Sequence, residues 1–359
     1  MSDTSIFTDA AGAARIVEKA VLFRGTSDNP KTGRNVLLVG APGTAKTSVA
    51  NSVAAKIDAD LITSVLVTHD ETETRGYPRI NEEKGEAEFF PFGDLAKAMR
   101  ATRNTIWLLD DFSQASREVQ ASFMALLLAR ELNGKKLPDC VSFVATANRR
   151  EDRSGAAGIL EAVKGRFTTI IEVRPDVDGF TDWAAENDIH ETVIAAINSR
   201  LVPLFDHAPS PDLVNQANPR TWEAVSDLLH MGLEKEDLKV AIPGAVGPLH
   251  GPEFLAYMSN CELMPNVDAI LSDPDSHNIA DETPSVMFAL VTSMARKSNR
   301  QNLGSICRFA ERCSESARGE HGALLMRLVR KINPHLVESS EWANLAVGPV
   351  GKLMSGDYR

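Results

Sequence analysis

Residues 37–50 of the chain read LLVGAPGTAKTSVA. The apolar run from Asn35 to Val39 predicts a short buried strand. From Lys46 onward, KTSVANSVAAKI has apolar residues at helical spacing and predicts a helix. A glycine-rich turn between a strand and a helix directs several backbone N–H groups into one concavity, at the positive end of the helix dipole. That geometry suits a phosphate group.

The turn follows the pattern G-x4-GK-[ST] except at one position, where Ala45 replaces the second glycine. Gly43 still permits unusual backbone angles, and alanine adds only a methyl group. Lys46 would reach the β- and γ-phosphates, and the Thr47 hydroxyl would ligate Mg²⁺. The alternative is an ordinary strand–turn–helix connection that contains a lysine by chance. The residues predicted to surround the phosphates are Gly40, Ala41, Pro42, Gly43, Thr44, Ala45, Lys46 and Thr47.

Length and composition exclude several classes of protein. The 359 residues allow two or three domains, and 43% hydrophobic and 24% charged residues are ordinary for a soluble globular protein. The net charge of −11 argues against nonspecific binding to nucleic-acid backbones, although a local basic stripe is compatible with it. The four cysteines are scattered and fit reduced thiols in a cytoplasmic protein. The sequence shows no positively charged leader and no membrane-length apolar run, so we expect neither export nor membrane insertion.

Strand and helix patterns alternate in the first half of the chain. A helix is expected from Thr8 to Phe23, and another in the segment SREVQASFMALLLAREL from Ser116. Near-continuous apolar strands between helices indicate a parallel sheet covered on both faces. We therefore predict an α/β domain over residues 1–175, with a five-stranded parallel sheet between helices. Besides the first strand, the predicted strands are LITSVLV from Leu61, IWLLDD from Ile106, VSFVATAN from Val141 and TTIIEV from Thr168.

From Asp176 onward, strand patterns fade and helical patterns follow one another. A stretch rich in Pro, Asp and Asn, MPNVDAILSDPDSHNIADETP, interrupts them. We predict an α-helical lid over residues 176–262 and a carboxy-terminal helical extension over residues 263–359.

The segment TIWLLDDFSQAS adds two acids at the end of a predicted strand. Asp110 and Asp111 would therefore lie at the carboxyl edge of the sheet, next to the phosphate turn. Asp110 would hold Mg²⁺ directly or through water, and Asp111 would accept a proton from the attacking water or orient it. Glutamate is more common as the second acid, and aspartate is one methylene shorter. The alternative is a pair of acids that cap the following helix.

Three further polar residues fit the same chemistry. Asn148 ends the strand FVATAN and could hydrogen-bond the γ-phosphate or the attacking water. Arg166, just before the last strand, could enter a neighbouring subunit's site and stabilise transition-state charge. Arg220, near a helix start, could report the γ-phosphate to the second domain. Rivals for the role of Arg166 are Arg149, Arg150 and Arg153.

In this order and spacing, the chain resembles an AAA+ ATPase, and more narrowly the MoxR-type branch. GAPGTAKT resembles Walker A and IWLLDD resembles Walker B. The resemblance places Asn148 at sensor 1, Arg166 at the arginine finger and Arg220 at sensor 2. The insertion at about residues 70–92 resembles the helix-2 hairpin that points toward the ring pore, and NGKKLPDCVSFVATANRRED resembles the pre-sensor segment. The likeness ends at about Asn260.

This resemblance implies a homo-oligomeric ring, which we expect to be a hexamer, with ATP and Mg²⁺ at the subunit boundaries. It implies a chaperone-like remodeller of a protein substrate that works beside a partner with a von Willebrand factor A (VWA) domain. Two other hypotheses stay open from the residues: a nucleic-acid-dependent motor, and a nucleotide-gated scaffold with little turnover. The acidic composition argues against the motor, and the short acid Asp111 keeps the scaffold open.

Overall fold

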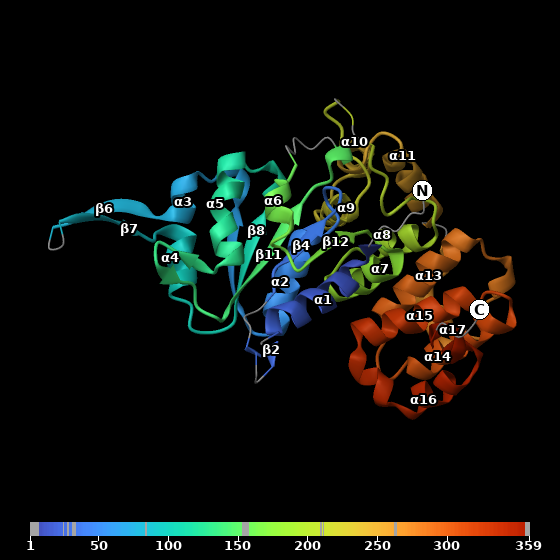
Figure 1. Cartoon of the computed structure of the whole chain (residues 1–359). Coiled ribbons are helices and arrows are strands. Elements are labelled where there is room, and N and C mark those ends of the chain that lie inside the picture. Colours follow the sequence, from blue (N-terminus) through green and yellow to red (C-terminus); the bar gives the residue numbers. More distant parts are fainter. Residues whose placement is uncertain are drawn as a thin grey trace, which may run out of the picture. The chain divides into compact units, whose positions relative to one another are not determined.

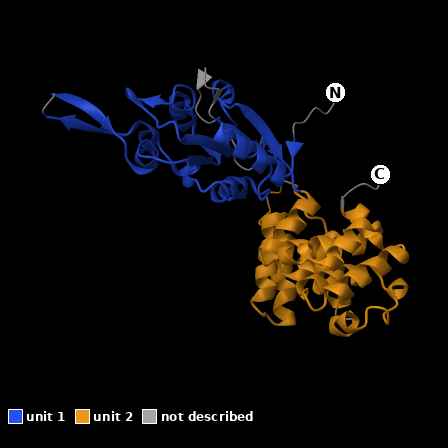
Figure 2. Ribbon diagram, turned by 90° about the horizontal axis from the view of Figure 1, so that it is seen from below, with its two compact units in different colours: residues 1–175 blue, residues 176–359 orange. Residues whose placement is uncertain are grey.

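The computed structural model describes residues 7–23, 25–26, 29–30, 34–82, 85–152, 158–208, 210, 212–261 and 264–355. The chain forms two compact units, Met1–Pro175 and Asp176–Arg359 (Figure 2). No helix in these described ranges has the length and apolar character that a membrane span requires.

The first unit is built on a parallel sheet of six strands. The predicted parallel sheet between helices is confirmed, with one strand more than expected. The additional strand, β1, is only two residues long and pairs at the sheet edge with Glu172 and Val173, so it leaves no periodic pattern in the sequence. In spatial order the strands are β1 (Phe7–Thr8), β12 (Thr169–Val173), β4 (Val36–Val39), β11 (Val141–Ala147), β8 (Thr105–Asp110) and β5 (Asp60–Val65).

Helices cover both faces of this sheet, because alternate side chains of each strand point to opposite faces. On β8, Trp107 and Leu109 pack against α4 (Gly93–Met99) and α5 (Arg117–Leu128). The intervening Ile106 and Leu108 pack against α1 (Ala10–Leu22) and α2 (Lys46–Lys56), as the layers in Figure 1 show. Burial of an aliphatic side chain such as Ile106, Leu108 or Leu109 contributes about 1.5–3 kcal/mol.

Helix α1 begins two residues later than the sequence predicts. Thr8 belongs to β1, and the Asp9 carboxylate accepts a hydrogen bond from the Gly12 N–H at 2.8 Å. An aspartate in this position satisfies one of the unpaired N–H groups of a helix start. The cap therefore separates the short edge strand from the helix.

The strand register brings the chemically informative segments to one edge of the sheet. Ala147 pairs with Val39, and the Gly40 N–H donates to the Ala147 carbonyl at 3.1 Å. On the other side of β11, Leu109 pairs with Ala145. Because all three strands run in parallel, the residues that follow β4, β8 and β11 meet at their carboxyl ends.

A hairpin extends from the body of the first unit (Figure 1). It consists of β6 (Tyr77–Asn81) and β7 (Glu86–Phe90), which pair antiparallel after helix α3 (Glu71–Arg75). It lies inside the insertion expected at about residues 70–92. The smaller elements of this unit are β2 (Gly25–Thr26), β3 (Asn29–Pro30), β9 (Glu131–Leu132), β10 (Lys135–Lys136), α6 (Glu161–Lys164), and the 3-10 turns η1 (Leu66–Thr68), η2 (Phe112–Gln114) and η3 (Arg150–Asp152).

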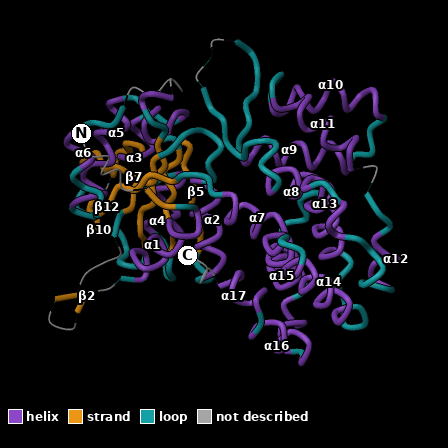
Figure 3. Tube along the Cα trace, turned by 90° about the vertical axis from the view of Figure 1, so that its right-hand side faces the viewer, coloured by secondary structure: helices purple, strands orange, loops and turns teal. Residues whose placement is uncertain are grey.

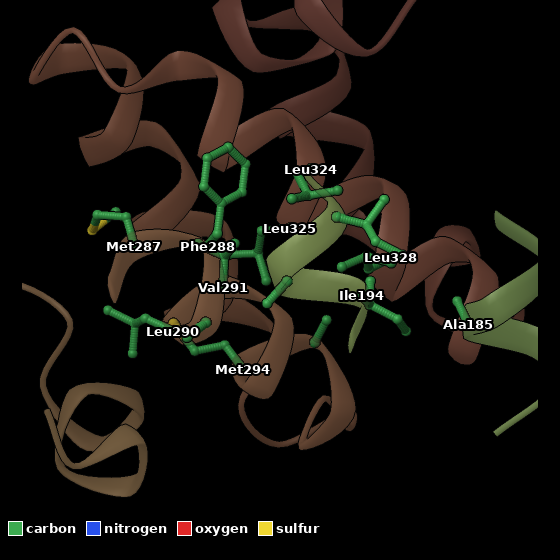
Figure 4. Close-up of a cluster of buried hydrophobic side chains, with 14 of the residues drawn as sticks. Ala185, Ile194, Met287, Phe288, Leu290, Val291, Met294, Leu324, Leu325 and Leu328 are labelled. Carbon is green, nitrogen blue, oxygen red and sulfur yellow. The ribbon is translucent and has the colours of Figure 1, made fainter. Parts of the chain in front are cut away.

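The described residues of the second unit form helices and no strand (Figure 3). One hydrophobic cluster runs through this unit from Phe180 to Val350, and Figure 4 shows its part around α8, α13 and α15. The predicted boundary between lid and extension, at residue 262, falls inside this continuous core. The helices are α7 (Val177–Glu186), α8 (Glu191–Asn198), α9 (Pro219–His230), α10 (Lys235–Val246), α11 (His250–Cys261), α12 (Val267–Ser272), α13 (Pro284–Arg296), α14 (Leu303–Glu315), α15 (Gly319–Ile332), α16 (Ser340–Val347) and α17 (Pro349–Ser355), with 3-10 turns η4 (Ile279–Asp281) and η5 (Pro334–Glu338).

Candidate functional site

The glycine-rich turn joins β4 to α2 at the carboxyl edge of the sheet. Gly40 has no room for a side chain, since a Cβ there would lie 2.7 Å from the Val173 carbonyl oxygen. Gly43 has a φ of 77°, and Ala45 has a φ of 64° at the N-cap of α2. The left-handed conformation costs about 1–2 kcal/mol for a residue with a Cβ. Residue 45 therefore has the backbone that favours glycine, although the chain places alanine there.

Lys46 lies inside this turn and is only 7% exposed. Its Nζ donates to the carbonyl oxygens of Gly40 at 2.9 Å and Ala41 at 2.7 Å, and to Asn148 Oδ1 at 3.1 Å. The turn thus places an ammonium group among backbone groups at a helix start. This combination of a cation, N–H groups and a helix dipole is suited to phosphate.

Asp110 is the last residue of β8, and its carboxylate accepts hydrogen bonds from two hydroxyl groups. Its Oδ1 accepts hydrogen bonds from Thr47 Oγ1 at 3.0 Å and Thr146 Oγ1 at 2.5 Å. A carboxylate beside a hydroxyl is a donor set that fits Mg²⁺, which takes oxygen ligands from one or two carboxylates, water and substrate phosphates. The described residues contain no group of three or more His, Cys, Asp and Glu side chains able to hold a metal. With one carboxylate and one hydroxyl from the chain, phosphate and water oxygens would supply the other ligands that Mg²⁺ usually takes.

Asp111 follows with a φ of 54°, also in the left-handed region. Its backbone N–H donates to Thr146 Oγ1 at 3.0 Å, and its Oδ1 accepts from Asn148 Nδ2 at 3.5 Å. Aspartate and asparagine enter this region more readily than other residues that carry a Cβ. The backbone conformation therefore gives a physical reason for aspartate rather than glutamate as the second acid.

Asn148 connects the phosphate turn with the acids. Its amide oxygen accepts from Lys46, its amide nitrogen donates to Asp111, and its backbone N–H donates to Ser113 Oγ at 3.0 Å. The structure thus brings together five residues that the sequence singled out: Lys46, Thr47, Asp110, Asp111 and Asn148.

Arg166 lies apart from this group. It precedes β12, toward the edge where the parallel strands begin, and its guanidinium donates to the Ala162 carbonyl oxygen. Its backbone carbonyl accepts from Asn35 Nδ2 at 3.1 Å. Arg220 is exposed near the start of α9 in the second unit. The roles of both arginines stay predictions.

Of the rival arginines, Arg149 is held by carboxylates. Its guanidinium lies 2.8 Å from Asp152, 3.1 Å from Glu172 and 3.3 Å from Glu151. The hydrogen bonds that Arg149 donates to Asp152, supported by the charges of all three acids, raise the pKa of Arg149. This network favours a structural role for Arg149. The side chain of Arg150 and all of Arg153 lie outside the described residues.

Sequence reasoning missed two buried hydroxyls of this site, those of Thr146 and Ser113. Thr146 lies in the otherwise largely apolar strand β11, VSFVATA, two positions before Asn148. A polar residue at this place in the sequence could have indicated that it belongs to the site. Ser113 follows the acid pair directly, in the turn η2.

An open hollow of about 580 Å³ lies elsewhere on the first unit. It occurs where β4 and β12 begin, opposite the phosphate turn. Its described lining holds neither a glycine-rich turn nor a carboxylate, so we place the candidate site at the carboxyl edge. The lining residues are Arg15, Ile16, Lys19, Ala20, Phe23, Arg34, Thr168 and Thr169.

Comparison with known proteins gives one family match. Residues 35–167 match the AAA domain of the dynein-related subfamily, a segment that contains β4, β5, β8 and β11 together with the phosphate turn and the acid pair.

Curated relatives are proteasome-activating nucleotidases. The one from Saccharolobus islandicus (strain M.14.25 / Kamchatka #1) is 34% identical over 221 residues, which are 59% of this chain and 52% of the relative. The one from Saccharolobus solfataricus is 31% identical over 216 residues, with 57% and 51% covered. The chain therefore spans about half the length of the curated relatives it matches.

Solved structures resemble the chain more distantly. NtrX from Brucella abortus in complex with ATP aligns with a TM-score of 0.41 and 14% identity, covering 89% of this chain and 69% of the other. The RuvB Holliday junction branch migration motor of Thermotoga maritima aligns with a TM-score of 0.35 and 11% identity, covering 85% and 76%.

Proposed function

We propose that this chain, whose residues 35–167 form an AAA+ P-loop NTPase domain, hydrolyses ATP and uses the energy to remodel a protein partner. The observation that carries the proposal is the hydrogen-bonded group at the carboxyl edge. Lys46, Asp111 and Asn148 are linked there within 3.5 Å, and Asp110 is linked to Thr47.

Each residue of this group has a distinct role in the proposal. The backbone N–H groups of residues 40–47 and the Lys46 ammonium bind the phosphates. Thr47 and Asp110 hold Mg²⁺, which neutralises charge on the phosphate oxygens when it is bound. Asp111 orients the attacking water or takes its proton, and Asn148 hydrogen-bonds the γ-phosphate or that water.

The proposal includes an assembly, because Lys46 is the one cation that the described residues bring to this group. Arg166 supplies that cation to the ATP of the neighbouring subunit in a ring, which we expect to be hexameric. Arg220 reports the γ-phosphate to the second unit. The location of Arg166 away from its own acids supports action in trans.

The proposed partner is a protein, in the manner of the MoxR-type branch, and a VWA-domain protein is the specific candidate. Two observations support a protein over nucleic acid: the net charge of −11, and relatives whose name, proteasome-activating nucleotidase, refers to a protein assembly. The hairpin β6–β7 is the proposed contact, and the cytoplasm is the proposed location. A second candidate function is a nucleotide-gated scaffold with little turnover, which the short acid Asp111 favours.

The decisive experiment measures phosphate release and molecular mass together, with ATP, ADP or no nucleotide. We expect turnover that requires Mg²⁺, and a larger assembly with ATP. Asp111→Asn should keep ATP binding and assembly but lose turnover, since asparagine preserves shape but carries no charge and takes up no proton. Assembly without turnover under all conditions would support the scaffold instead. Stimulation by added single- or double-stranded DNA would support the motor.

A further inference from the structure

The buried Thr146 side chain contacts both acids of the site. This residue of β11 is 1% exposed. Its Oγ1 donates to Asp110 Oδ1 at 2.5 Å and accepts from the Asp111 N–H at 3.0 Å. A hydroxyl has one proton and two lone pairs, so one group can make both contacts at once. Thr146 thus binds the side chain of one acid and the backbone of the next.

These contacts begin where the strand ladder ends. The register of β8 and β11 runs to the pair Leu109 and Ala145. Beyond it, Thr146 bonds across to the acids, and Ser113 Oγ accepts from the Asn148 N–H at 3.0 Å. The buried hydroxyls of Thr146, in β11, and Ser113, just after β8, therefore continue the connection between these two strands beyond the end of their backbone ladder.

The contacts also determine how each acid is presented. Thr47 and Thr146 both donate to Oδ1 of Asp110, which fixes the rotation of the carboxylate. The bond to the Asp111 N–H holds the peptide that leads into the left-handed conformation of Asp111. Thr146 and Asn148 are two positions apart at the end of β11, where side chains at this spacing point to the same face.

We propose that Thr146 is a positioning residue, which orients Asp110 toward the metal and Asp111 toward the attacking water. This inference rests on the proposed ATPase function. Residues that orient a metal ligand in this way affect metal affinity or activity by about 10- to 100-fold when they are changed.

The test uses two substitutions at Thr146 and a matched control on the same strand. Thr146→Val keeps the branched shape but removes the donor and the acceptor, and Thr146→Ser keeps the hydroxyl. Ser142→Ala removes another buried hydroxyl of β11, one that donates to the Val21 carbonyl at 3.4 Å near the opposite end of the strand. Thermal unfolding of each variant identifies losses that come only from a weakened fold.

Two measurements are made on the full chain. The first is Mn²⁺ binding to the ADP-loaded protein by electron paramagnetic resonance. The second is the Mg²⁺ dependence of ATP turnover. We expect Thr146→Val to weaken Mn²⁺ binding and lower turnover by about 10-fold or more, while affinity for ADP without metal changes less than about twofold. Thr146→Ser and Ser142→Ala should stay within about threefold of the parent in both measurements.

Unchanged Mn²⁺ affinity and turnover in Thr146→Val would overturn the inference. Equal losses in Thr146→Val and Ser142→Ala would overturn it as well, because they would indicate a general effect of losing a buried hydroxyl. If the parent protein binds Mn²⁺ and ADP but releases no phosphate, the proposed ATPase function fails, while the Mn²⁺ measurement still decides the role of Thr146.

Discussion

The carboxyl edge of the sheet and the β6–β7 hairpin belong to the same unit. The edge buries polar side chains, whereas the hairpin exposes apolar ones. At the edge, Lys46 and Asn148 are polar and buried. On the hairpin, Tyr77 and Ile80 are apolar and 65% and 73% exposed. Burying a polar group costs stability unless it is hydrogen-bonded, and contiguous exposed apolar side chains often mark an interaction surface. Under the proposed function, the edge binds a small polar ligand and the hairpin contacts a macromolecule.

The two regions also differ in how they are held. The polar groups of the edge bond to segments far apart in the chain, as Lys46 does to Asn148. The hairpin pairs its own two strands and packs the rings of Tyr77 and Phe92, whose centroids are 6.4 Å apart. Arg79 and, from β10, Lys135 lie over the ring of Phe90. A two-stranded ribbon is only marginally stable on its own. We therefore expect substitutions at the edge to change chemistry and substitutions on the hairpin to change recognition.

The largest effect should come from Arg166. Arg166→Ala should assemble and bind ATP but turn it over about a thousand-fold more slowly, because transition-state charge loses its cation. Mixing Arg166→Ala with Asp111→Asn should restore some activity, since some boundaries would then pair an intact Asp111 with an intact Arg166. Turnover by a strictly monomeric enzyme, or full activity of Arg166→Ala, would contradict this prediction and move the role to another residue.

A smaller effect is expected at Lys46. Lys46→Ala should weaken binding of a fluorescent ATP analogue by about 10- to 100-fold, since hydrogen bonds to charged groups contribute about 1.5–3 kcal/mol. Lys56→Ala is the matched control in the same helix, because that lysine is exposed and pairs only with Glu18, at 2.7 Å, in the described structure. Equal affinities of the two variants would remove the phosphate role from Lys46.

Backbone strain at the edge predicts an effect on stability rather than on binding. Ala45→Gly should raise the free energy of unfolding by up to about 1 kcal/mol, because relief of the left-handed alanine exceeds the entropy that glycine adds to the unfolded chain. The same change at Ala55, an exposed residue in the last turn of α2, should lower it, by less than the about 1 kcal/mol that glycine costs in a helix interior. Urea unfolding compares the two, and a loss at both positions would show that residue 45 is not strained.

The hairpin should show the smallest effect on basal chemistry. Alanine at both Tyr77 and Arg79 should leave basal turnover within about twofold, because neither side chain contacts the phosphate edge and exposed substitutions change stability little. Stimulation of turnover by an unfolded model protein, carboxymethylated lactalbumin, should fall. Val240→Ala, at an exposed position of α10, is the control. An equal fall in basal and stimulated turnover would contradict the assignment of partner recognition, rather than ATP turnover, to the hairpin.

Much of this edge was predictable because its signals are local. The turn at Gly40 to Thr47 and the acids after an apolar strand each occupy a few consecutive residues, and parallel strands bring their ends together. The strand β1 was missed because two residues carry no periodicity. The left-handed conformation of Asp111 and its bond to Thr146 depend on a neighbouring strand, so no local pattern contains them.

In the second unit, helix α10 continues through a proline, a residue that usually ends a helix. Pro243 lies inside α10, although proline lacks the N–H that continues a helix. Gly251 of α11 packs so closely on Pro243 that a Cβ would lie 2.4 Å from the Pro243 Cα. Tertiary packing of this kind outweighs local propensity, and it cannot be read from either segment alone.

The long sequence separations at the phosphate edge have a consequence for synthesis. Lys46 and its partner Asn148 are 102 positions apart, and Thr47 and Asp110 are 63 apart. At about 5–20 residues per second, a ribosome would add Asn148 about 5–20 seconds after Lys46. During that interval the nascent chain has the glycine-rich turn but not the strand that completes its surroundings. We therefore expect nucleotide to stabilise the domain only after β11 has emerged and joined β4, so ATP would act on a sheet in which β4, β8 and β11 are already in place.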